Sequence, residues 1–146
     1  MRPTAATPTR PANYALISAV YATAFGATVA ASGRTGELPT QRELLPLGLA
    51  TSCYTRVVTQ QKVEEWLRRP FVEEPPDAPW RPRGRGLRYA VGELLLCTRC
   101  TGAWVGLGLV ALRVAAPRAG RLAAATGTVG TVNDAAQAAF AWLRSR

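Results

Sequence analysis

The chain has 146 residues, enough for one domain; 18% of them are charged and 48% belong to the hydrophobic set. It carries a formal net charge of +9 and no histidine, which excludes Ser-His-Asp and Cys-His catalysis and the common catalytic zinc sites. The basic residues lie between long apolar stretches rather than along one stripe. This distribution is typical of a membrane protein that contacts anionic lipids, and it speaks against nucleic-acid binding.

The first segment, residues 1–12, has three prolines and two arginines without apolar periodicity, and we predict a disordered tail. The 19 residues from Tyr14 to Ser32 carry no charge and match the roughly 20 residues that cross a bilayer core. We therefore predict a membrane-spanning helix. A secretory signal peptide is the alternative, because Ala30 and Ser32 resemble a cleavage site, although signal-peptide cores are usually about 7–15 residues long.

Two further apolar stretches have a mixed character. Leu44–Val58 contains Arg56 and several hydroxyl side chains, so we predict an amphipathic membrane helix with one side against protein. Leu122–Leu143 is rich in Ala, Gly and Thr, which favours close packing against neighbouring helices. An interfacial or soluble helix is the alternative for both stretches.

Between these stretches lies a polar region. Gln60–Phe71 predicts a short interfacial helix, in which Glu64 and Glu65 precede Arg68 and Arg69 by four residues and support them on the surface. Residues 72–88 are rich in proline and arginine, and we predict a cytoplasmic linker without a packed core.

The stretch from Tyr89 to Ala116 predicts one long helix that ends before Pro117. It has no charge between Thr101 and Leu112, and Gly102 with Gly106 forms a G-x-x-x-G pair that permits close helix approach.

Together these elements predict an all-α fold: an integral membrane helical bundle of about four transmembrane helices plus a short interfacial helix, over residues 13–146. Eleven basic residues fall on one side of such a bundle: Arg2, Arg10, Lys62, Arg68, Arg69, Arg81, Arg83, Arg85, Arg88, Arg144 and Arg146. Five fall on the other: Arg34, Arg42, Arg113, Arg118 and Arg121. The excess predicts a protein of the bacterial inner membrane with both termini in the cytoplasm.

Four ionisable residues lie in or near the apolar segments: Arg56, Glu93, Arg99 and Asp134. Charges are costly in lipid, so we predict a buried network in which Arg56 pairs with Glu93. Such a network either marks a functional site or fixes the helix register.

The C-x-x-C pair Cys97 and Cys100 is the clearest candidate for chemistry. On one helix, Glu93, Cys97, Cys100 and Trp104 would share a face. A helix start and the nearby Arg99 favour a redox pair, and unwinding there would be needed for a disulfide. The same thiols are weak candidates for a metal site, and packing alone is the remaining interpretation.

The run from Val91 to Trp104, read as G-E-L-L-x-C-x-x-C-x-x-x-W, resembles the signature of the domain of unknown function 1360 family. The segments 56–71 and 116–134 are similar to further family elements, and the resemblance covers about residues 45–141. It implies a small multi-pass bacterial membrane protein and supplies no activity. The chain departs from the family pattern at five positions: Ser52, Cys53, Gln61, Thr98 and Arg99.

The function that we predict is a non-enzymatic membrane scaffold that binds a membrane protein partner or forms a homo-oligomer, without a cofactor. The alternative is a membrane thiol–disulfide oxidoreductase that uses Cys97 and Cys100. Two points weigh against the oxidoreductase: the predicted cytoplasmic position, where thiols stay reduced, and the lack of a visible partner dithiol.

Overall fold

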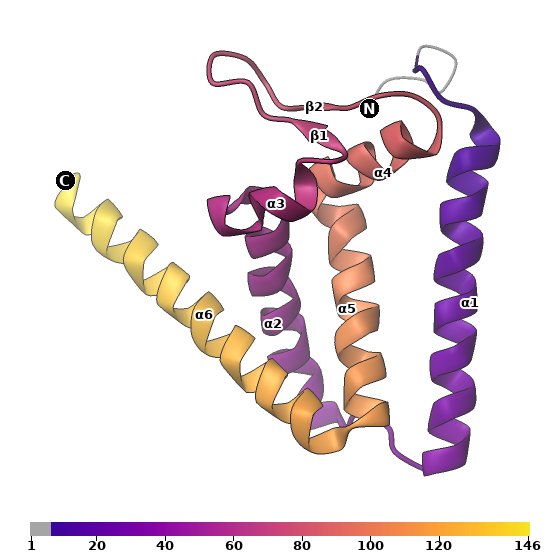
Figure 1. Cartoon of the computed structure of the whole chain (residues 1–146). Coiled ribbons are helices and arrows are strands. Elements are labelled where there is room, and N and C mark those ends of the chain that lie inside the picture. The colour runs from indigo at the N-terminus through magenta and orange to yellow at the C-terminus, as the bar shows by residue number, and fades with distance from the viewer. Residues whose placement is uncertain (1–6) are drawn as a thin grey trace. The chain divides into compact units, whose positions relative to one another are not determined.

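The computed structural model describes residues 7–146 and confirms the predicted all-α class (Figure 1). The helices are α1 Pro11–Thr35, α2 Gln41–Gln60, α3 Glu65–Arg68, α4 Leu87–Leu96, α5 Thr98–Ala115 and α6 Pro117–Arg144, with a 3-10 turn at Lys62–Glu64. Two short strands, β1 Val72–Glu73 and β2 Arg81–Pro82, lie between α3 and α4. Half of the predicted tail, residues 1–6, lies outside the described residues, and α1 begins within its other half.

The described residues form two compact units. The first comprises residues 7–27 and Thr55–Trp104, and the second comprises Thr28–Tyr54 and Val105–Arg146. Because α1, α2 and α5 each cross from one unit to the other, the division cuts through helices rather than through linkers.

In the first unit, the segment that we predicted as an unpacked linker forms a small hairpin. β1 pairs antiparallel with β2, with Val72 opposite Pro82, and Val72 is 1% exposed. The hairpin packs on α4 at Gly92, where an added Cβ would meet the Phe71 carbonyl oxygen and, at 3.0 Å, the Pro82 Cβ. Only glycine fits at this contact. The proline-rich sequence of residues 72–88 carries no pattern from which the hairpin could have been predicted.

The predicted long helix from Tyr89 to Ala116 is two helices, because α4 and α5 meet at Cys97 with a bend of 89°. Cys97 has an extended backbone, with φ −94° and ψ 97°. The Thr101 hydroxyl donates a hydrogen bond of 2.8 Å to the Leu94 carbonyl oxygen near the end of α4. Our prediction that Glu93 and the cysteines share one helix face is therefore wrong, since Glu93 belongs to α4.

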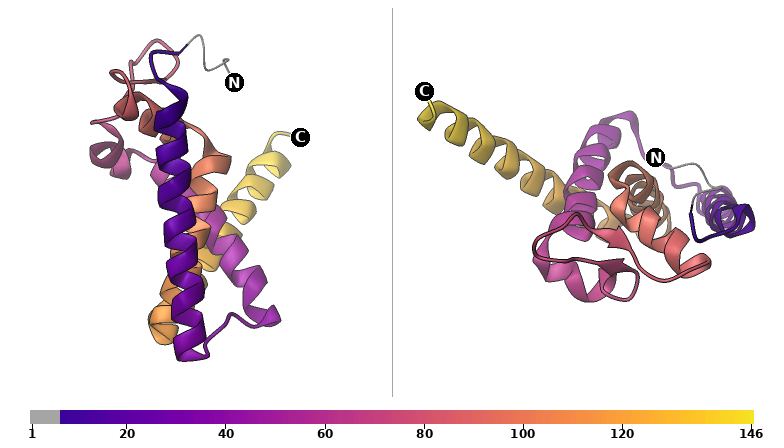
Figure 2. Two further views of the ribbon diagram at one scale, coloured as in Figure 1. Left: turned by 90° about the vertical axis from the view of Figure 1, so that its right-hand side faces the viewer. Right: turned by 90° about the horizontal axis from the view of Figure 1, so that it is seen from above.

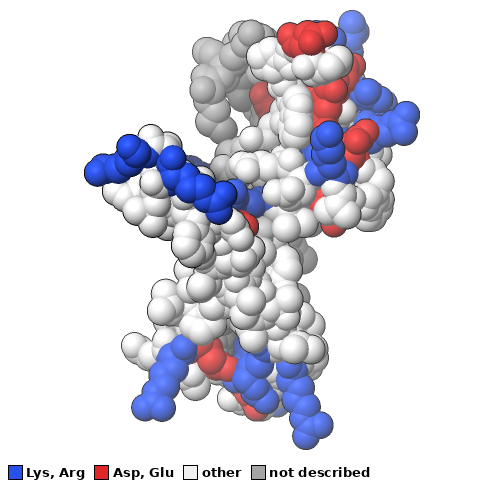
Figure 3. Space-filling view, turned by 90° about the vertical axis from the view of Figure 1, so that its left-hand side faces the viewer, with Lys and Arg blue, Asp and Glu red and all other residues white. Residues whose placement is uncertain are grey.

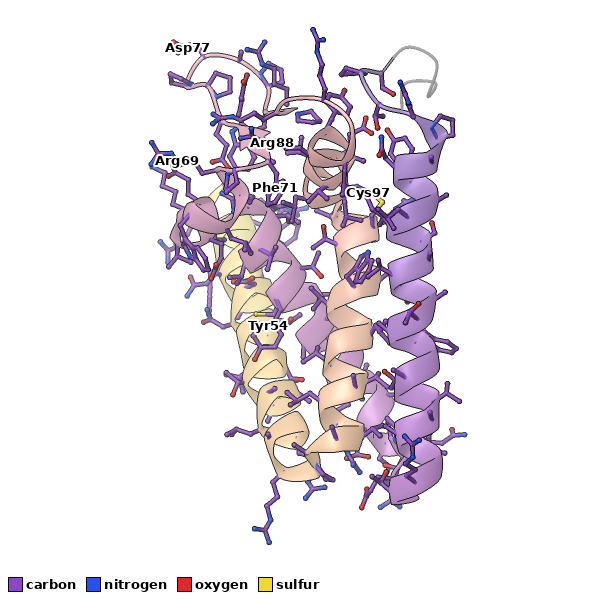
Figure 4. The ribbon with its side chains drawn as sticks, turned by 45° about the vertical axis from the view of Figure 1, so that its right-hand side comes forward. Tyr54, Arg69, Phe71, Asp77, Arg88 and Cys97 are labelled. Carbon is purple, nitrogen blue, oxygen red and sulfur yellow. A yellow bond between two sulfur atoms is a disulfide. The ribbon has the colours of Figure 1, made fainter. Side chains whose placement is uncertain are left out.

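Arg68 also departs from the sequence prediction, because its side chain is fully buried rather than paired on the surface. Its Nε donates to Glu74 at 2.7 Å, and its Nη1 donates to the carbonyl oxygens of Val58 and Gln61 at 2.8 and 2.9 Å. The guanidinium thus satisfies carbonyls at the carboxyl end of α2. Arg69, the next residue, is exposed (Figure 4).

In the second unit, α6 packs against the first turns of α2 through a small core that contains Leu47, Ala50, Leu109 and Ala124. The approach is close because an added Cβ at Gly127 would lie 2.7 Å from the Ala50 Cα. Hydroxyl groups connect the same two helices: Thr131 donates to the Leu49 carbonyl at 2.6 Å. Small residues of α6 therefore pack as the sequence predicted.

The G-x-x-x-G pair of α5 lies against α2. A Cβ added to Gly102 would meet the Thr55 Oγ1 at 3.5 Å, and one added to Gly106 would meet the Thr51 Cγ2 at 3.6 Å. These are ordinary contact distances, so the predicted close approach is confirmed at both glycines, each within its own unit.

Fewer helices could span a membrane than the four that we predicted. By length and composition, α1 is the helix within residues 7–146 that could cross a membrane, and the bent pair α4–α5 would count as a second span. A signal sequence near the N-terminus has the same length and apolar composition. Figure 3 shows one face of the molecule, on which Lys and Arg side chains gather in groups and much of the remaining surface is uncharged.

Candidate functional site

The candidate site is the junction of α4 and α5 in the first unit, where Cys97 and Cys100 form a disulfide (Figure 4). Their Cα atoms are 5.2 Å apart, within the range that a disulfide tolerates. The break in the helix at Cys97 supplies the unwinding that the sequence analysis required for such a bond. Thr98 and Arg99, between the two cysteines, are exposed, while both cysteines are half-buried.

Cys97 stands immediately before the first residue of α5, and its Sγ accepts a hydrogen bond of 3.3 Å from the Cys100 backbone N–H. This is the position and the bond of a helix N-cap. The amide groups of a first helical turn carry partial positive charge, and the exposed Arg99 adds a full charge nearby. The arrangement therefore favours negative charge on the Cys97 sulfur whenever the disulfide is reduced.

Aromatic side chains of α1 flank this junction within the same unit. The Tyr14 hydroxyl donates a hydrogen bond to the Glu93 carboxylate. On α5, about one turn after Cys100, Trp104 makes an edge-to-face contact with Tyr21 at a centroid distance of 5.1 Å. These contacts fix α1 beside the cysteines, a feature for which the sequence held no signal.

The predicted charge network is divided between the units. Arg56, Glu93 and Arg99 belong to the first unit, on α2, α4 and α5, and Asp134 belongs to the second, on α6. Arg56 and Arg99 are exposed, whereas Glu93 and Asp134 are partly buried. Glu93 receives a neutral donor, Tyr14, and its pairing with Arg56 stays a prediction.

Two buried arginines carry ion pairs that the sequence analysis missed. One is Arg68, described above, and the other is Arg113 of the second unit, with a side chain 6% exposed. Arg113 donates to Glu37 at 3.0 Å and to Glu43 at 2.8 Å. Glu43 also accepts a hydrogen bond of 2.8 Å from the Thr40 backbone N–H. The sequence carried only a weak signal for this contact, namely that Glu37 and Glu43 lie close to Arg34 and Arg42.

A metal site has less support than a redox site. Among residues 7–146, no three His, Cys, Asp or Glu side chains are grouped so as to hold a metal ion. Cys53, the third cysteine, packs in the second unit, where its Sγ would lie 2.6 Å from a Cβ added to Gly130.

Comparison with known proteins gives a family without an activity. Residues 46–140 match the family described as "Protein of unknown function (DUF1360)". No curated protein and no solved structure matches the chain. The family match spans the hairpin, the α4–α5 junction and most of α6. The chain belongs to the domain of unknown function 1360 family.

Proposed function

We propose that the chain is a membrane-bound thiol–disulfide exchange protein in which Cys97 is the attacking thiol and Cys100 resolves the intermediate. The observation that supports this most strongly is the Cys97–Cys100 disulfide at the start of α5, with the Cys97 Sγ accepting the Cys100 N–H. A merely structural pair of small apolar residues needs neither the break in the helix nor an N-cap bond. The exposed residues between the cysteines leave a substrate a path to the sulfur atoms.

The count of basic residues favours a cytoplasmic position for the first unit, and on that side cellular dithiols would keep the pair reduced. The Cys97 thiolate attacks one sulfur of a substrate protein disulfide; a Cys97–substrate bond forms, and the substrate S–S bond breaks. The released substrate thiolate takes up a proton. Cys100 then loses its proton and attacks the Cys97 sulfur, which releases the second substrate thiol and forms the Cys97–Cys100 disulfide. Two electrons pass to the substrate, and a cytosolic dithiol restores the pair.

The Cys100→Ser variant should accumulate a mixed disulfide at Cys97. Reduced, detergent-purified protein on a Cys53→Ser background is mixed with glutathione disulfide at mildly acidic pH, and adduct formation is followed by intact-mass spectrometry. Cys97 should react at least tenfold faster in Cys100→Ser than Cys100 does in Cys97→Ser, because only Cys97 has the N-cap bond. The protein with both cysteines should return to the internal disulfide.

Equal rates for the two single-cysteine variants would contradict the assigned roles. If a Cys97→Ala, Cys100→Ala protein fully restored the phenotype of cells that lack the protein, the redox function would be excluded and the scaffold would remain as the function. One observation favours that second candidate: Ala135–Arg144, the last part of α6, is exposed throughout, including Phe140, Trp142 and Leu143. Figure 2 shows the C-terminus of the chain at the end of this helix. A membrane protein partner or a second copy is the occupant that such a helix end would take.

We further propose that the protein is multi-pass in the inner membrane, with α2 and α6 as additional spans and with both termini in the cytoplasm. The support is the uncharged length of α1 and the two groups of arginines at the ends of the apolar helices.

The full chain should remain with the membrane fraction after extraction with alkaline carbonate and after high salt. Bilayer insertion of α1 resists both treatments, whereas attraction between surface arginines and lipid does not. The measurement is an immunoblot of the pellet and the supernatant, with a peripheral protein as the control for extraction. Release of the chain into the supernatant would show that neither α1 nor the other helices are inserted.

A further inference from the structure

The second unit contains an apolar groove of about 440 Å³ between the first turns of α2 and one face of α6. Pro46 and Leu47 of α2 form one wall, and Ala124, Ala125 and Val129 of α6 form the other. This volume lies within the usual range of about 300–1,000 Å³ for small-molecule sites. Glu43, Arg113 and Arg121 also line the groove, but the surface that the lining exposes is almost entirely carbon, which suits a hydrocarbon chain.

The groove ends in positive charge. Arg121 lines it and also lines a second hollow beside the first turn of α6, together with Arg118 and Glu37. Arg118 and Arg121 are exposed. Glu43 lines the groove and Glu37 lines the second hollow, but both carboxylates are paired with Arg113. Positive charge therefore prevails where the groove opens.

The first turn of α6 adds backbone donors at the same place. Its N-cap residue, Ala116, provides no side-chain hydrogen bond. Pro117 has no N–H and the Gly120 N–H donates to the Ala116 carbonyl oxygen at 2.9 Å, so the early donors without a partner inside the helix are the N–H groups of Arg118 and Ala119. Because these groups and the helix dipole favour an anion, they act in the same direction as Arg118 and Arg121.

The position of this charge relative to α1 identifies the ligand as a lipid. The last turns of α1, up to Thr35, belong to the same unit, and Glu37, two residues further, is bound to Arg113. If α1 crosses the bilayer, this end lies among the lipid head groups. The groove then runs from Arg121 toward Val129, which is eight residues or about 12 Å along the helix and into the acyl-chain layer.

We propose that the groove binds an anionic glycerophospholipid such as phosphatidylglycerol. The phosphodiester lies against Arg118, Arg121 and the first turn of α6, and one acyl chain occupies the groove beside Ala125. This site is separate from the basic loop at residues 60–88, which contacts lipid through charge alone. The inference rests on the proposed membrane location and is independent of the thiol chemistry.

The test measures retention of added lipid by the detergent-purified full chain, using native mass spectrometry with phosphatidylglycerol and phosphatidylcholine of identical acyl chains. Phosphatidylglycerol should bind at least tenfold more tightly. Arg118→Gln with Arg121→Gln should weaken phosphatidylglycerol binding about 10- to 30-fold, since each of the two basic residues contributes a similar amount to the binding free energy of an anionic head group. Ala125→Trp should abolish binding of both lipids, because the indole ring fills the groove.

Matched controls lie on the same helix. Arg144→Gln with Arg146→Gln removes the same charge, and Ala136→Trp adds the same ring at an exposed position outside the groove. Both should bind phosphatidylglycerol normally, and circular dichroism confirms folding of every variant. Equal binding of the two lipids, or equal loss in the controls, would overturn the proposal. Displacement of the lipid by glycerol 3-phosphate would reduce the site to an anion site and overturn it too. None of these results would alter carbonate resistance or Cys97 reactivity, so the proposals fail separately.

Discussion

Arg68→Gln should lower the free energy of unfolding by about 3–5 kcal/mol, whereas Arg69→Gln should change it by less than about 0.5 kcal/mol. Arg68 is fully buried and engages Glu74 and the carbonyl oxygens of Val58 and Gln61. The substitution leaves the carboxylate without its cation and removes the donors from the end of α2. The Trp80 ring, 5.1 Å from the guanidinium carbon, loses its cation as well.

Equilibrium unfolding in mixed micelles, followed by circular dichroism, measures the difference between these neighbouring substitutions. A double-mutant cycle with Glu74→Gln assigns the part that belongs to the ion pair: the double variant should be less destabilised than the sum of the single ones. Similar small effects for Arg68→Gln and Arg69→Gln would show that the buried guanidinium contributes nothing to stability.

Gly120→Ala should destabilise the protein by about 3 kcal/mol, whereas Gly108→Ala should stabilise it by up to about 1 kcal/mol. A Cβ at Gly120 would meet the backbone of Arg113, including its nitrogen at 2.7 Å. Because backbone atoms cannot swing aside as a flexible side chain does, α5 and α6 would have to separate. Nothing lies within 4 Å of a Cβ at Gly108, so only the helix-forming advantage of alanine remains there.

The same unfolding experiment compares both glycine variants with the unchanged protein. Opposite signs at the two positions are the expected result, although both glycines lie in the same unit and both substitutions add one methyl group. A stabilising Gly120→Ala would mean that the turn between α5 and α6 opens at little cost, and the close packing described for this turn would be wrong.

Apolar length and residue size predicted much of this fold from the sequence. The stretch from Tyr14 to Ser32 lies within α1, and the small residues of the last stretch pack on α2 as α6. The C-x-x-C motif marked the candidate site, and its family was recognisable from residues around it. These features follow from local composition or from a fixed spacing, which a single sequence displays directly.

Features that depend on distant partners escaped prediction. Arg68 has the sequence environment of a surface ion pair. Its burial depends on contacts with Glu74 and with the end of α2, which offset the cost of removing the charge from water. The bend at Cys97 lies inside a stretch that has no proline to announce a break, because the bonds that replace the helical ones come from Thr101 and from the disulfide. The hairpin depends on Gly92, which no turn signature announces.

The contacts of α1 bear on its fate after synthesis. Processing by a signal peptidase near Ala30 would remove Tyr14 and Tyr21 from the mature chain. Glu93 would lose its hydroxyl donor, and Trp104 would lose its aromatic neighbour, both beside the cysteines. A cleaved signal peptide would not form part of the mature site, so these contacts favour retention of α1 in the mature protein. If α1 is retained, it supplies both the apolar length that we propose holds the protein in the membrane and the aromatic contacts beside the proposed redox pair.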